Sequence, residues 1–388
     1  MGRMLPRGNT PDERDQRMTT PVLRTEELDY ELPAGLIATR PAVPRDSARM
    51  LVMSRQADGI EHRQVRDLPD YVQPDDLLIM NDTAVTPARV FGRKSTSGGA
   101  GGRIEGLFLE QAQSGRWRMM LRSNGRLRAG MGIELADRRG EPSGVKLVLI
   151  ERDHADWIVQ VEPARPAADV LDAIGWTPLP PYIIRARHGE TASDEDDRRW
   201  YQTVYASAAR RESVAAPTAG LHFTPELLAA LDARGVRRAF VTLHVGPGTF
   251  RPITAAAVQG HQMHRERFEV PAATMEAIRS HRERRAAGGS GRLLAVGTTT
   301  VRTLESLPQP LPRAIPGPCR GATDLLIAPP YEFRVVEGLL TNFHLPRSTL
   351  LALVGALAGL EKLKAAYREA IARRYRFYSY GDAMLILP

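Results

Sequence analysis

The sequence contains a single cysteine, Cys319, among 388 residues. One cysteine excludes an intramolecular disulfide, and it also excludes a zinc or iron–sulfur site built from several cysteines. This composition fits a reducing compartment, so we expect the chain to be cytoplasmic.

Long hydrophobic runs are absent as well. The longest, Leu350–Leu360, contains two glycines and falls short of the roughly 20 residues that a membrane-spanning helix needs. The first residues include basic side chains but no apolar segment behind them, so we expect neither a secretory signal nor a membrane partner. With 43% hydrophobic residues the chain is globular, and it is long enough for two or three domains.

Several common functional motifs are missing. The glycine-rich tract Gly98–Arg103 lacks the Gly-Lys-Ser/Thr that closes a phosphate-binding loop, and no G-x-G-x-x-G follows a first strand. The sequence also contains no H-E-x-x-H. His261 and His264 stand three residues apart with Glu266 nearby, which is conceivable metal-ligand spacing. A loop in front of the alternating strand R-F-E-V explains the same residues more simply, so we expect no metal.

The charge is strongly positive. The formal net charge is +8, and arginine far outnumbers lysine. An anionic partner such as a nucleic acid is therefore favoured. A solvated basic surface would give the same composition, so charge alone leaves this point open.

The pattern of hydrophobic and polar residues changes twice along the sequence, and these changes predict the domain organisation. Residues 88–177 hold short alternating segments joined by glycine-rich turns, which is typical of an antiparallel β-barrel or sandwich. Residues 24–87 and 178–388 alternate strand and helix patterns. We therefore expect an α/β fold in which a larger mixed α/β, barrel-like catalytic domain carries an inserted antiparallel β-barrel domain. Residues 1–23 are polar and without periodicity, so we expect a disordered tail.

The segment Ser213–Thr224, S-V-A-A-P-T-A-G-L-H-F-T, joins two elements. Its small apolar start predicts the end of a buried strand, and Pro217 and Gly220 break that pattern. Thr224 then stands as the N-cap of a helix with Pro225 at its first position. Loops between a strand's carboxyl end and a helix N-terminus are where α/β folds bind ligands.

The same unit recurs three times, with polar loops after strands that end near Val245, Val296 and Thr341. If these strands are parallel neighbours, their loops meet on one face of the sheet. Turn glycines and helix caps are the alternative explanation for the same residues. Five of the nine histidines lie in these loops, which suits proton transfer near neutral pH: His222, His244, His261, His264 and His344.

Six long motifs carry a resemblance to a known family, and they occur in order along nearly the whole chain, within Tyr30–Ile386. They are S-V-A-A-P-T-A-G-L-H-F at 213–223, L-H-V-G-P-G-T-F at 243–250, H-Q-M-H-R-E at 261–266, G-T-T-T-V-R-T-L-E-S at 297–306, L-L-T-N-F-H-L-P-R-S-T-L-L at 339–351 and Y-R-F-Y-S-Y-G-D-A-M at 375–384. In these motifs the sequence resembles the S-adenosylmethionine:tRNA ribosyltransferase-isomerases of queuosine biosynthesis.

The resemblance implies an α/β domain with an inserted β-barrel, and it implies a specific reaction. The ribosyl part of S-adenosylmethionine is transferred to 7-aminomethyl-7-deazaguanine at the wobble position of a tRNA anticodon and rearranged, which gives epoxyqueuosine and releases adenine and methionine. The sulfonium acidifies the neighbouring 5′ C–H and is a good leaving group. The protein must then supply a base, an acid and oriented hydrogen bonds. We therefore expect no cofactor besides the co-substrate S-adenosylmethionine, a tRNA partner and a monomeric chain.

The resemblance also suggests roles for individual residues. We expect His222 and His344 to transfer protons, with His244 as a third catalytic residue. Arg302 and Asp382 would pair with the carboxylate and amino groups of the methionine. The remaining expected substrate-binding residues are Thr218, Gly220, Gly246, Gly248, Thr249, His264, Thr298, Thr299, Thr300 and Asn342, and those expected to bind tRNA are Arg89, Arg93, Lys94, Arg122 and Arg126.

The sequence departs from the family pattern at four positions: Ala84, Asn124, Glu212 and Pro330. The first two stand where the pattern has a basic residue, so they remove positive charge. A diverged relative that moves the same ribosyl group to a small acceptor other than tRNA is therefore one alternative. A non-catalytic RNA-binding protein is another, although pure binding would not need the histidine and threonine loops.

Overall fold

The computed structural model describes residues 22–96, 99–113, 115–187, 192–250, 252–312 and 315–388. The expected tail, 1–23, lies almost wholly outside these ranges. Leu23, however, is buried, and its carbonyl accepts a hydrogen bond from the Val258 N–H at 2.9 Å. The packed part of the chain therefore begins before residue 24.

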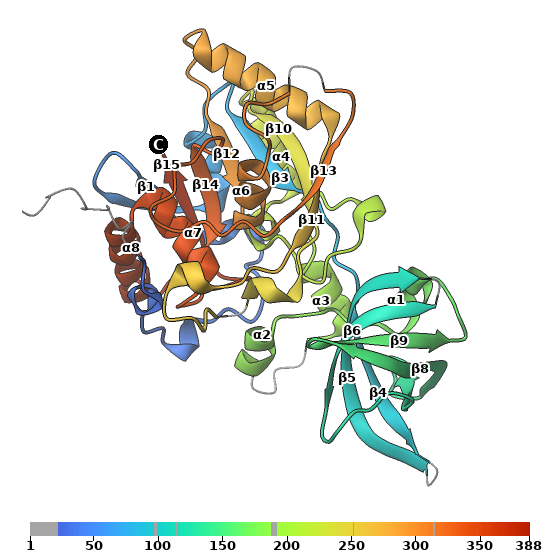
Figure 1. Ribbon diagram of the computed structural model, residues 1–388. Coiled ribbons are helices and arrows are strands. Elements are labelled where there is room, and N and C mark those ends of the chain that lie inside the picture. The colour runs from blue at the N-terminus through green and yellow to red at the C-terminus, as the bar shows by residue number, and fades with distance from the viewer. Residues whose placement is uncertain (1–21, 97–98, 114, 188–191, 251, 313–314) are drawn as a thin grey trace, which may run out of the picture.

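A nine-stranded sheet forms the larger part of the molecule (Figure 1), in the order β13-β11-β10-β3-β12-β14-β15-β1-β2. We expected a barrel-like closure here, but the described strands form an open sheet with β13 and β2 at its edges. The pattern of β2 explains its edge position, since three of its five residues are exposed and the others only half-buried. The strands are β1 (Arg49–Ser54), β2 (Ile60–Gln64), β3 (Leu77–Asn81), β10 (Arg237–Leu243), β11 (Glu266–Val270), β12 (Leu293–Val296), β13 (Cys319–Thr323), β14 (Gly338–Asn342) and β15 (Ala383–Leu387).

Four central strands run parallel as neighbours, because β3 pairs in parallel with both β10 and β12, and β12 pairs in parallel with β14. All residues of β3, β12 and β14 are buried, as expected for strands covered on both faces. Leu77 and Ile79 of β3 pack in one apolar cluster, and Leu78 and Met80 pack in another on the opposite face. The first cluster includes helices α5 (Ala272–Ala286), α6 (Thr298–Glu305) and α7 (Thr349–Ala358), and the second includes α4 (Pro225–Ala233).

The segment Ser213–Ala216 is not the strand that we expected. It makes a single parallel bridge, from Ser213 to Val85, and it is followed by the 3-10 helix η6 (Thr218–His222). The Ser213 hydroxyl accepts the Val245 N–H at 2.9 Å, and the backbone pairing is limited to a few bonds: Ser213 pairs with Ala84 and Thr86, and the Val214 N–H donates to the Val245 carbonyl. The helix start after it is confirmed, because Thr224 Oγ1 accepts the Leu227 N–H at 3.2 Å.

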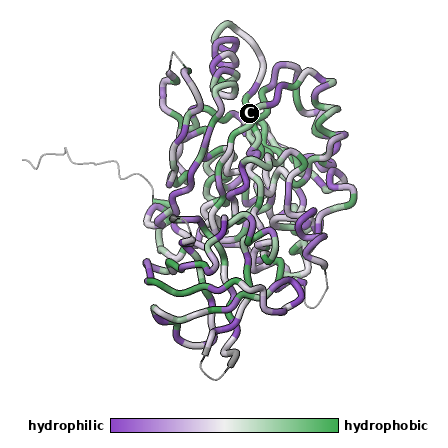
Figure 2. Tube along the Cα trace, turned by 90° about the vertical axis from the view of Figure 1, so that its right-hand side faces the viewer, coloured by the Kyte–Doolittle hydropathy of each residue, from purple (hydrophilic) through white to green (hydrophobic). Residues whose placement is uncertain are grey.

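Six antiparallel strands close into a barrel that stands beside the sheet (Figure 1), in the order β4-β5-β6-β9-β8-β7. Its interior is filled by alternate residues such as Trp117 and Met119, and Figure 2 shows both hydrophobic and hydrophilic segments in these strands. The expected antiparallel barrel is therefore present, while the division of the chain into domains at 88 and 177 stays a prediction. The strands are β4 (Arg89–Thr96), β5 (Gly99–Gln113), β6 (Arg116–Ser123), β7 (Gly132–Ala136), β8 (Pro142–Asp153) and β9 (Asp156–Glu162).

Short helices connect the barrel and the sheet. Helix α1 (Ala167–Ile174) packs on the barrel core, while α2 (Pro181–Ala186) and α3 (Asp194–Trp200) lie on the return path to the sheet. Across the described ranges, no helix has the length and apolar character to cross a membrane. The remaining helices are α8 (Leu360–Ala372), η1 (Thr25–Leu28), η2 (Ala34–Leu36), η3 (Arg45–Ser47), η4 (Val65–Asp70), η5 (Ala208–Arg210), η7 (Pro247–Phe250) and η8 (Val258–Gly260).

Candidate active site

A narrow cavity of about 20 Å³ lies where the parallel strands end. Its walls come from the η6 segment, the end of β10, the start of α6 and the end of β14. The ends of β10 and β14 and the start of α6 are distant in sequence, and they meet because β10, β3, β12 and β14 run parallel as neighbours. The lining residues are Ala216, Pro217, Thr218, Ala219, Val245, Gly297, Thr298, Thr299, Thr341, Asn342, His344 and Leu350.

Gly297 turns the chain from β12 directly into α6. Its φ is 87°, in the region that favours glycine, and its N–H donates to the Leu340 carbonyl at 2.8 Å. The helix therefore begins at once, with Thr298 and Thr299 on the cavity wall. The first N–H groups of a helix have no intrahelical acceptor, so this corner can supply donors to a bound oxygen or nitrogen.

Asn342 joins β14 to His222. Its Nδ2 lies 3.2 Å from His222 Nε2 and 3.1 Å from the Tyr378 carbonyl oxygen. Because the amide nitrogen donates, His222 Nε2 accepts and the imidazole proton lies on Nδ1. Asn342 Oδ1 is buried and has no hydrogen-bond partner among the described residues. A buried acceptor of this kind is costly unless a ligand satisfies it, so it points to a donor on the substrate.

His344 lies on the cavity wall, with Nε2 2.8 Å from Thr341 Oγ1. Two tyrosines hydrogen-bond to its main chain. The Tyr30 hydroxyl donates to the His344 carbonyl oxygen, and the His344 N–H donates to the Tyr367 hydroxyl at 2.8 Å. The imidazole is therefore held by groups on both sides of its loop.

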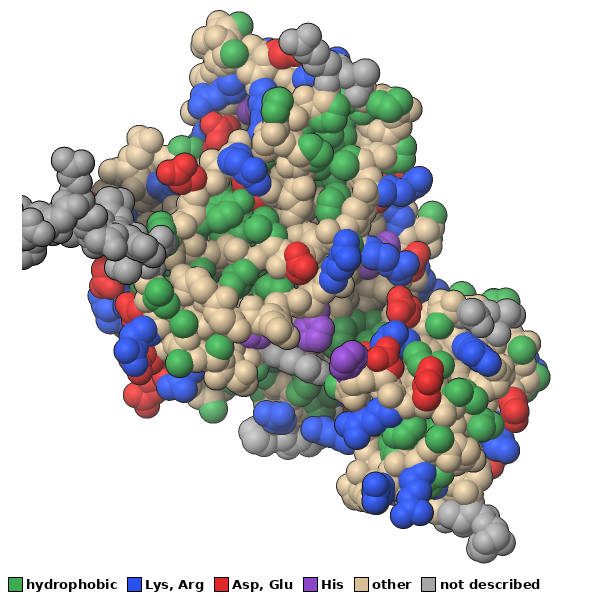
Figure 3. Space-filling model, in the orientation of Figure 1, with side chains coloured by type: hydrophobic (Ala, Val, Ile, Leu, Met, Phe, Trp, Pro, Cys, Tyr) green, Lys and Arg blue, Asp and Glu red, His purple; other side chains and the backbone are tan. Residues whose placement is uncertain are grey.

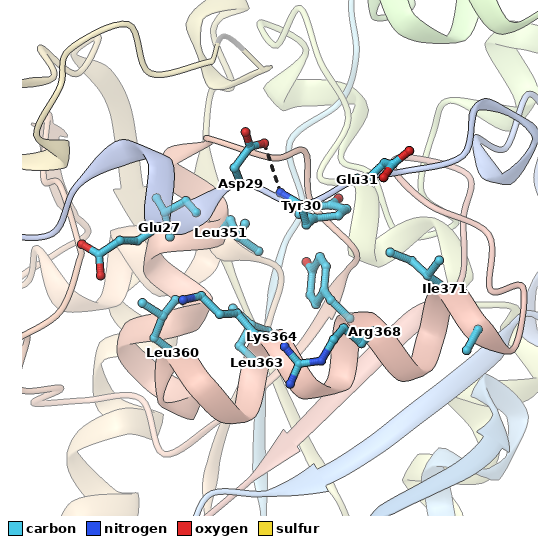
Figure 4. Close-up of a pocket in the computed structure, with 13 residues that line it drawn as sticks. Glu27, Asp29, Tyr30, Glu31, Leu351, Leu360, Leu363, Lys364, Arg368 and Ile371 are labelled. Carbon is cyan, nitrogen blue, oxygen red and sulfur yellow. Dashed lines mark hydrogen bonds between the residues drawn. The ribbon is translucent and has the colours of Figure 1, made fainter.

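Tyr30 and Tyr367 also line a second, larger groove (Figure 4), between 27–31 and α8. Leucines and Ile371 make up much of its wall, with Lys364 and Arg368 along one side. None of the expected site residues lines it. The groove therefore backs the His344 loop and is separate from the cavity at the strand ends.

His344 on the cavity wall and His222, which contacts the lining residue Asn342, are both neutral at physiological pH. Burial lowers the pKa of His222 to about 4, although the nearby Asp382 carboxylate opposes this shift, and burial lowers the pKa of His344 to about 3. Neutral imidazoles can accept a proton or a hydrogen bond, but they cannot act as acids before substrate binds. The site as it stands therefore supplies bases and oriented hydrogen bonds.

His244 lies outside the cavity lining. Its Nδ1 is 3.2 Å from Thr83 Oγ1, and its Nε2 is 3.9 Å from a carboxylate oxygen of Glu212. Burial lowers its pKa, and the Glu212 carboxylate opposes the shift. Val245, the next residue after β10, lines the cavity, whereas His244 contacts Thr83 and Glu212 instead. The expected catalytic role of His244 therefore stays a prediction without support from this geometry.

Arg302 was expected to bind the methionine carboxylate, but it already holds a carboxylate of the protein. Its Nη1 forms an ion pair with Glu266 Oε2, and both side chains are at most 4% exposed. The other oxygen, Glu266 Oε1, accepts the Gly246 N–H at 2.8 Å. Arg302 therefore fixes the loop after β10 through Glu266. In the sequence we named Glu266 only beside the conceivable metal ligands His261 and His264, and its pairing with Arg302 was not predicted because the two residues are 36 apart in sequence.

Asp382 is occupied in a similar way. Its carboxylate accepts the main-chain N–H groups of Arg49 and Arg376, at 3.1 and 2.8 Å. The two arginine side chains lie 3.2 and 3.4 Å from the same carboxylate. Asp382 thus anchors the C-terminal segment beneath His222, and in this arrangement it is not free to hold an amino group.

The other expected substrate-binding residues separate into two groups. Thr218, Thr298 and Thr299 line the cavity with Asn342 and His344, and the Thr299 hydroxyl accepts from Asn81 Nδ2 at 3.2 Å. The second group packs around the cavity. Thr300 Oγ1 donates to the Val296 carbonyl. Gly220 and Gly248 leave no room for a side chain, since a Cβ would lie 2.0 Å from the Tyr205 hydroxyl at Gly220 and 2.0 Å from the His264 ring at Gly248. The Thr249 side chain lies outside the described residues.

The residues expected to bind tRNA differ in their exposure to solvent. Arg89 is only 15% exposed, pairs with Glu105 at 2.9 Å and donates to the Leu179 carbonyl, so it fastens the barrel to the return segment. Arg93 and Lys94 line a groove on the barrel, while Arg122 and Arg126 are exposed. In Figure 3, Lys and Arg side chains gather on both sides of the hollow between barrel and sheet, and histidines lie along it.

Metal ligands do not gather in this region. Within the described ranges, no group of three or more His, Cys, Asp or Glu side chains is placed to hold a metal ion. His264 packs against Gly248 instead. The expectation of a metal-free protein is therefore compatible with the geometry and stays a prediction.

An open sheet with histidines, threonines and an asparagine converging at the ends of parallel strands is the architecture of an enzyme. Residues 25–386 match the family model described as queuosine biosynthesis protein, so the chain belongs to this family. It is 46% identical over 385 residues to the S-adenosylmethionine:tRNA ribosyltransferase-isomerase of Gloeobacter violaceus, covering 98% of this chain and 99% of that protein. The corresponding protein of Pelobacter propionicus is 45% identical, with 93% and 99% covered.

A solved structure agrees with these relatives. The crystal structure of S-adenosylmethionine tRNA ribosyltransferase from Thermotoga maritima is similar to this chain, with 36% sequence identity and a TM-score of 0.50. The similarity covers 93% of this chain and 100% of the other.

The depressed histidine pKa values predict a specific pH profile. A group with a pKa of about 3 or 4 in the folded protein stays neutral down to that pH, whereas an unperturbed histidine would be protonated below about 6.5. We expect kcat/KM for S-adenosylmethionine to show no histidine-dependent loss between pH 8 and pH 5. An acid limb near pH 6.5 that disappears in His344→Gln would contradict this prediction.

The buried Arg302–Glu266 pair predicts a large stability effect. Glu266→Gln leaves the Arg302 charge buried without a counter-charge, which costs about 3–5 kcal/mol. We expect thermal unfolding at a clearly lower temperature. The matched control is Glu276→Gln, which breaks an ion pair with Arg279 on the surface of α5 and should cost less than about 1 kcal/mol. Equal shifts in both variants would show that the buried pair does not fix the loop.

Proposed function

We propose that this protein transfers and isomerises the ribosyl group of S-adenosylmethionine onto 7-aminomethyl-7-deazaguanine at the tRNA wobble position, releasing adenine and methionine. One observation carries the proposal: segments of the family motifs that are far apart in the sequence converge on a single cavity at the ends of parallel strands. Family membership over residues 25–386 supports it. A cytoplasmic location, a monomeric chain and the absence of a resident cofactor belong to the same proposal.

His344 is the best-placed base for the first step. It lines the cavity, its pKa keeps it neutral, and a hydrogen bond between Nε2–H and Thr341 Oγ1 would leave Nδ1 as an acceptor. The sulfonium makes the 5′ C–H acidic, so a neutral imidazole can remove that proton. The electron pair left on carbon then begins the rearrangement that ends with loss of methionine.

His222 has a positioning role in this proposal. It reaches the cavity through Asn342, whose Nδ2 it holds at 3.2 Å. This contact fixes the amide orientation and leaves Oδ1 directed to accept a hydrogen bond from a substrate hydroxyl or amine. Thr218 and Thr298 add hydroxyls on the same walls, which suits a ribose with several oxygens.

The barrel groove supports RNA as the acceptor. Arg93 on β4 stands directly opposite Arg103 on β5, and like charges opposite each other destabilise a sheet unless an anion lies between them. Lys94 lines the same groove, and the Phe91 ring beside it is 38% exposed, although Glu134 on β7 also faces Arg93. Cations combined with an exposed aromatic ring suit a single-stranded nucleic acid.

The departures from the family pattern do not remove this surface. Ala84 is buried and its N–H donates to the Arg210 carbonyl, so its side chain contributes nothing to the outside. Glu212 forms an ion pair with Arg267 at 2.7 Å, and Pro330 follows a cis peptide bond. Asn124 is exposed in the turn between Arg122 and Arg126. Transfer to a small acceptor other than tRNA remains the alternative.

Product analysis tests the reaction directly. We expect incubation with S-adenosylmethionine and tRNA that carries the deazaguanine precursor to release adenine and methionine in equal amounts, with the tRNA nucleoside gaining the mass of the rearranged ribosyl group. Deuterium at the 5′ position should be partly lost. Formation of S-adenosylhomocysteine would contradict ribosyl transfer, and turnover on the free base but not on tRNA would favour the small-acceptor alternative.

The two histidines should differ in their kinetic effects. His344→Ala removes the base, so we expect kcat to fall by about 10²–10⁴. His222→Ala releases Asn342, so we expect a smaller fall in kcat together with a higher KM for S-adenosylmethionine. The control is His154→Ala, since that side chain is 97% exposed on the barrel. Full turnover by His344→Ala would rule out its role as the base.

Chelation tests the metal-free mechanism. We expect exhaustive treatment with EDTA to leave turnover unchanged, because no metal-ligand cluster occurs among the described residues. Loss of activity that zinc restores would overturn this part of the proposal.

A further inference from the structure

A second, polar pocket lies between the barrel and the sheet, and no step of the reaction proposed above uses it. Its volume is about 100 Å³, and we call it the junction pocket. Its residues come from the segment before β4, from the segment after α1 and from the end of α3 and beyond. They are Val85, Thr86, Pro87, Thr177, Pro178, Arg198, Tyr201, Gln202 and Arg211.

Two hydroxyls of the junction pocket are buried without a well-formed hydrogen bond, those of Thr177 and Tyr201. Neither is isolated, because Thr177 lies against the Asp194 carboxylate, and Tyr201 lies against the Ala216 main chain and the Ser379 side chain. Burial raises the pKa of Tyr201, so its hydroxyl keeps its proton. The Thr177 hydroxyl, at the pocket wall, can turn from Asp194 toward a polar ligand.

The two arginines of the pocket are held in place with donors to spare. Arg198 uses Nε to bind Asp194 and Nη2 to bind the Gly175 carbonyl, at 2.7 and 2.6 Å. Arg211 uses Nη2 to bind Asp172 at 2.7 Å and Nε to contact the Val85 carbonyl at 3.5 Å. The Nη1 group of each arginine has no acceptor in the described part of the chain.

Gln202 completes a set of donors. Its Oε1 accepts the Val85 N–H at 3.1 Å, so its NH₂ group is the end that remains. Two guanidinium Nη1 groups and one amide NH₂ are therefore available, with the Thr177 hydroxyl beside them, and the carboxylates of Asp172 and Asp194 do not line the pocket. Such a set suits an oxygen-rich anion, and phosphate is the anion that guanidinium groups recognise best.

The junction pocket lies next to the reaction cavity. Tyr201 packs in one cluster with Ala216 and Leu221, and Ala216 lines the cavity. On its other side the pocket adjoins the barrel, because Trp176, the residue before Thr177, pairs through its main chain with Arg89 at the start of β4. An RNA strand that places a base in the cavity and its neighbours on the barrel would pass this point.

We propose that the junction pocket binds a backbone phosphate of the RNA acceptor, close to the nucleotide that is modified. The proposal rests on the proposed function for its RNA ligand. Inorganic phosphate has the same chemistry, so the experiment must separate the two sources.

The test measures binding of an anticodon stem-loop RNA in the absence of S-adenosylmethionine, so a failure of the ribosyl transfer reaction would not affect it. For Arg211→Gln we expect weaker binding and a salt slope smaller by about 0.7–0.9, the contribution of one phosphate. Thr177→Val removes one hydroxyl and should weaken binding by about fivefold. The matched control is Arg373→Gln, which removes an arginine that is likewise paired with a carboxylate, on α8.

Melting curves separate a binding role from a structural one. Thr177 Oγ1 makes no well-formed hydrogen bond in the free protein, so Thr177→Val should change the melting temperature little while it weakens RNA binding. Inorganic phosphate should compete with the RNA only at millimolar concentration. An unchanged salt slope in Arg211→Gln, or RNA binding by Thr177→Val equal to that of the wild type, would overturn the proposal; tight binding of inorganic phosphate alone would show that the pocket holds free phosphate.

Discussion

The parallel pairing of β3 with β10 and β12 is the constraint on which the site depends. Asn81, the last residue of β3, makes this pairing specific at the strand ends. Its amide donates to the Leu243 carbonyl and to Thr299 Oγ1, and its Oδ1 accepts the Leu243 N–H. One buried amide therefore fixes β10 and the first turn of α6 relative to β3. Without this alignment, the Gly297 turn and Asn342 would not meet.

The charges around the cavity are used for positioning. Arg302 with Glu266 and Asp382 with Arg49 and Arg376 form ion pairs in the surrounding layer, so the cavity itself holds neutral groups. A site of this kind acts on a substrate that brings its own charge and leaving group, as a sulfonium does. Oriented dipoles in a buried site stabilise developing charge better than water does, because they need no reorganisation.

The sequence predicted the elements whose signals are local. The barrel follows from alternation and glycine turns, and the start of α4 follows from Thr224 and Pro225, because a cap and a fixed φ act within one turn. The prediction of a strand at Ser213 was wrong, since its small apolar residues are buried by tertiary contacts and its backbone pairing is limited to an isolated bridge. The roles suggested for Arg302 and Asp382 stay predictions, and their ion pairs could not be foreseen because the partners Glu266 and Arg49 are distant in sequence.

A structure of the protein with S-adenosylmethionine tests the central claim most directly. We predict that the ribose lies in the cavity at the strand ends, with a hydroxyl within hydrogen-bond distance of Asn342 Oδ1 and the 5′ carbon facing the His344 imidazole. S-adenosylmethionine bound in the groove between 27–31 and α8, with Asn342 Oδ1 still unpaired, would contradict the account.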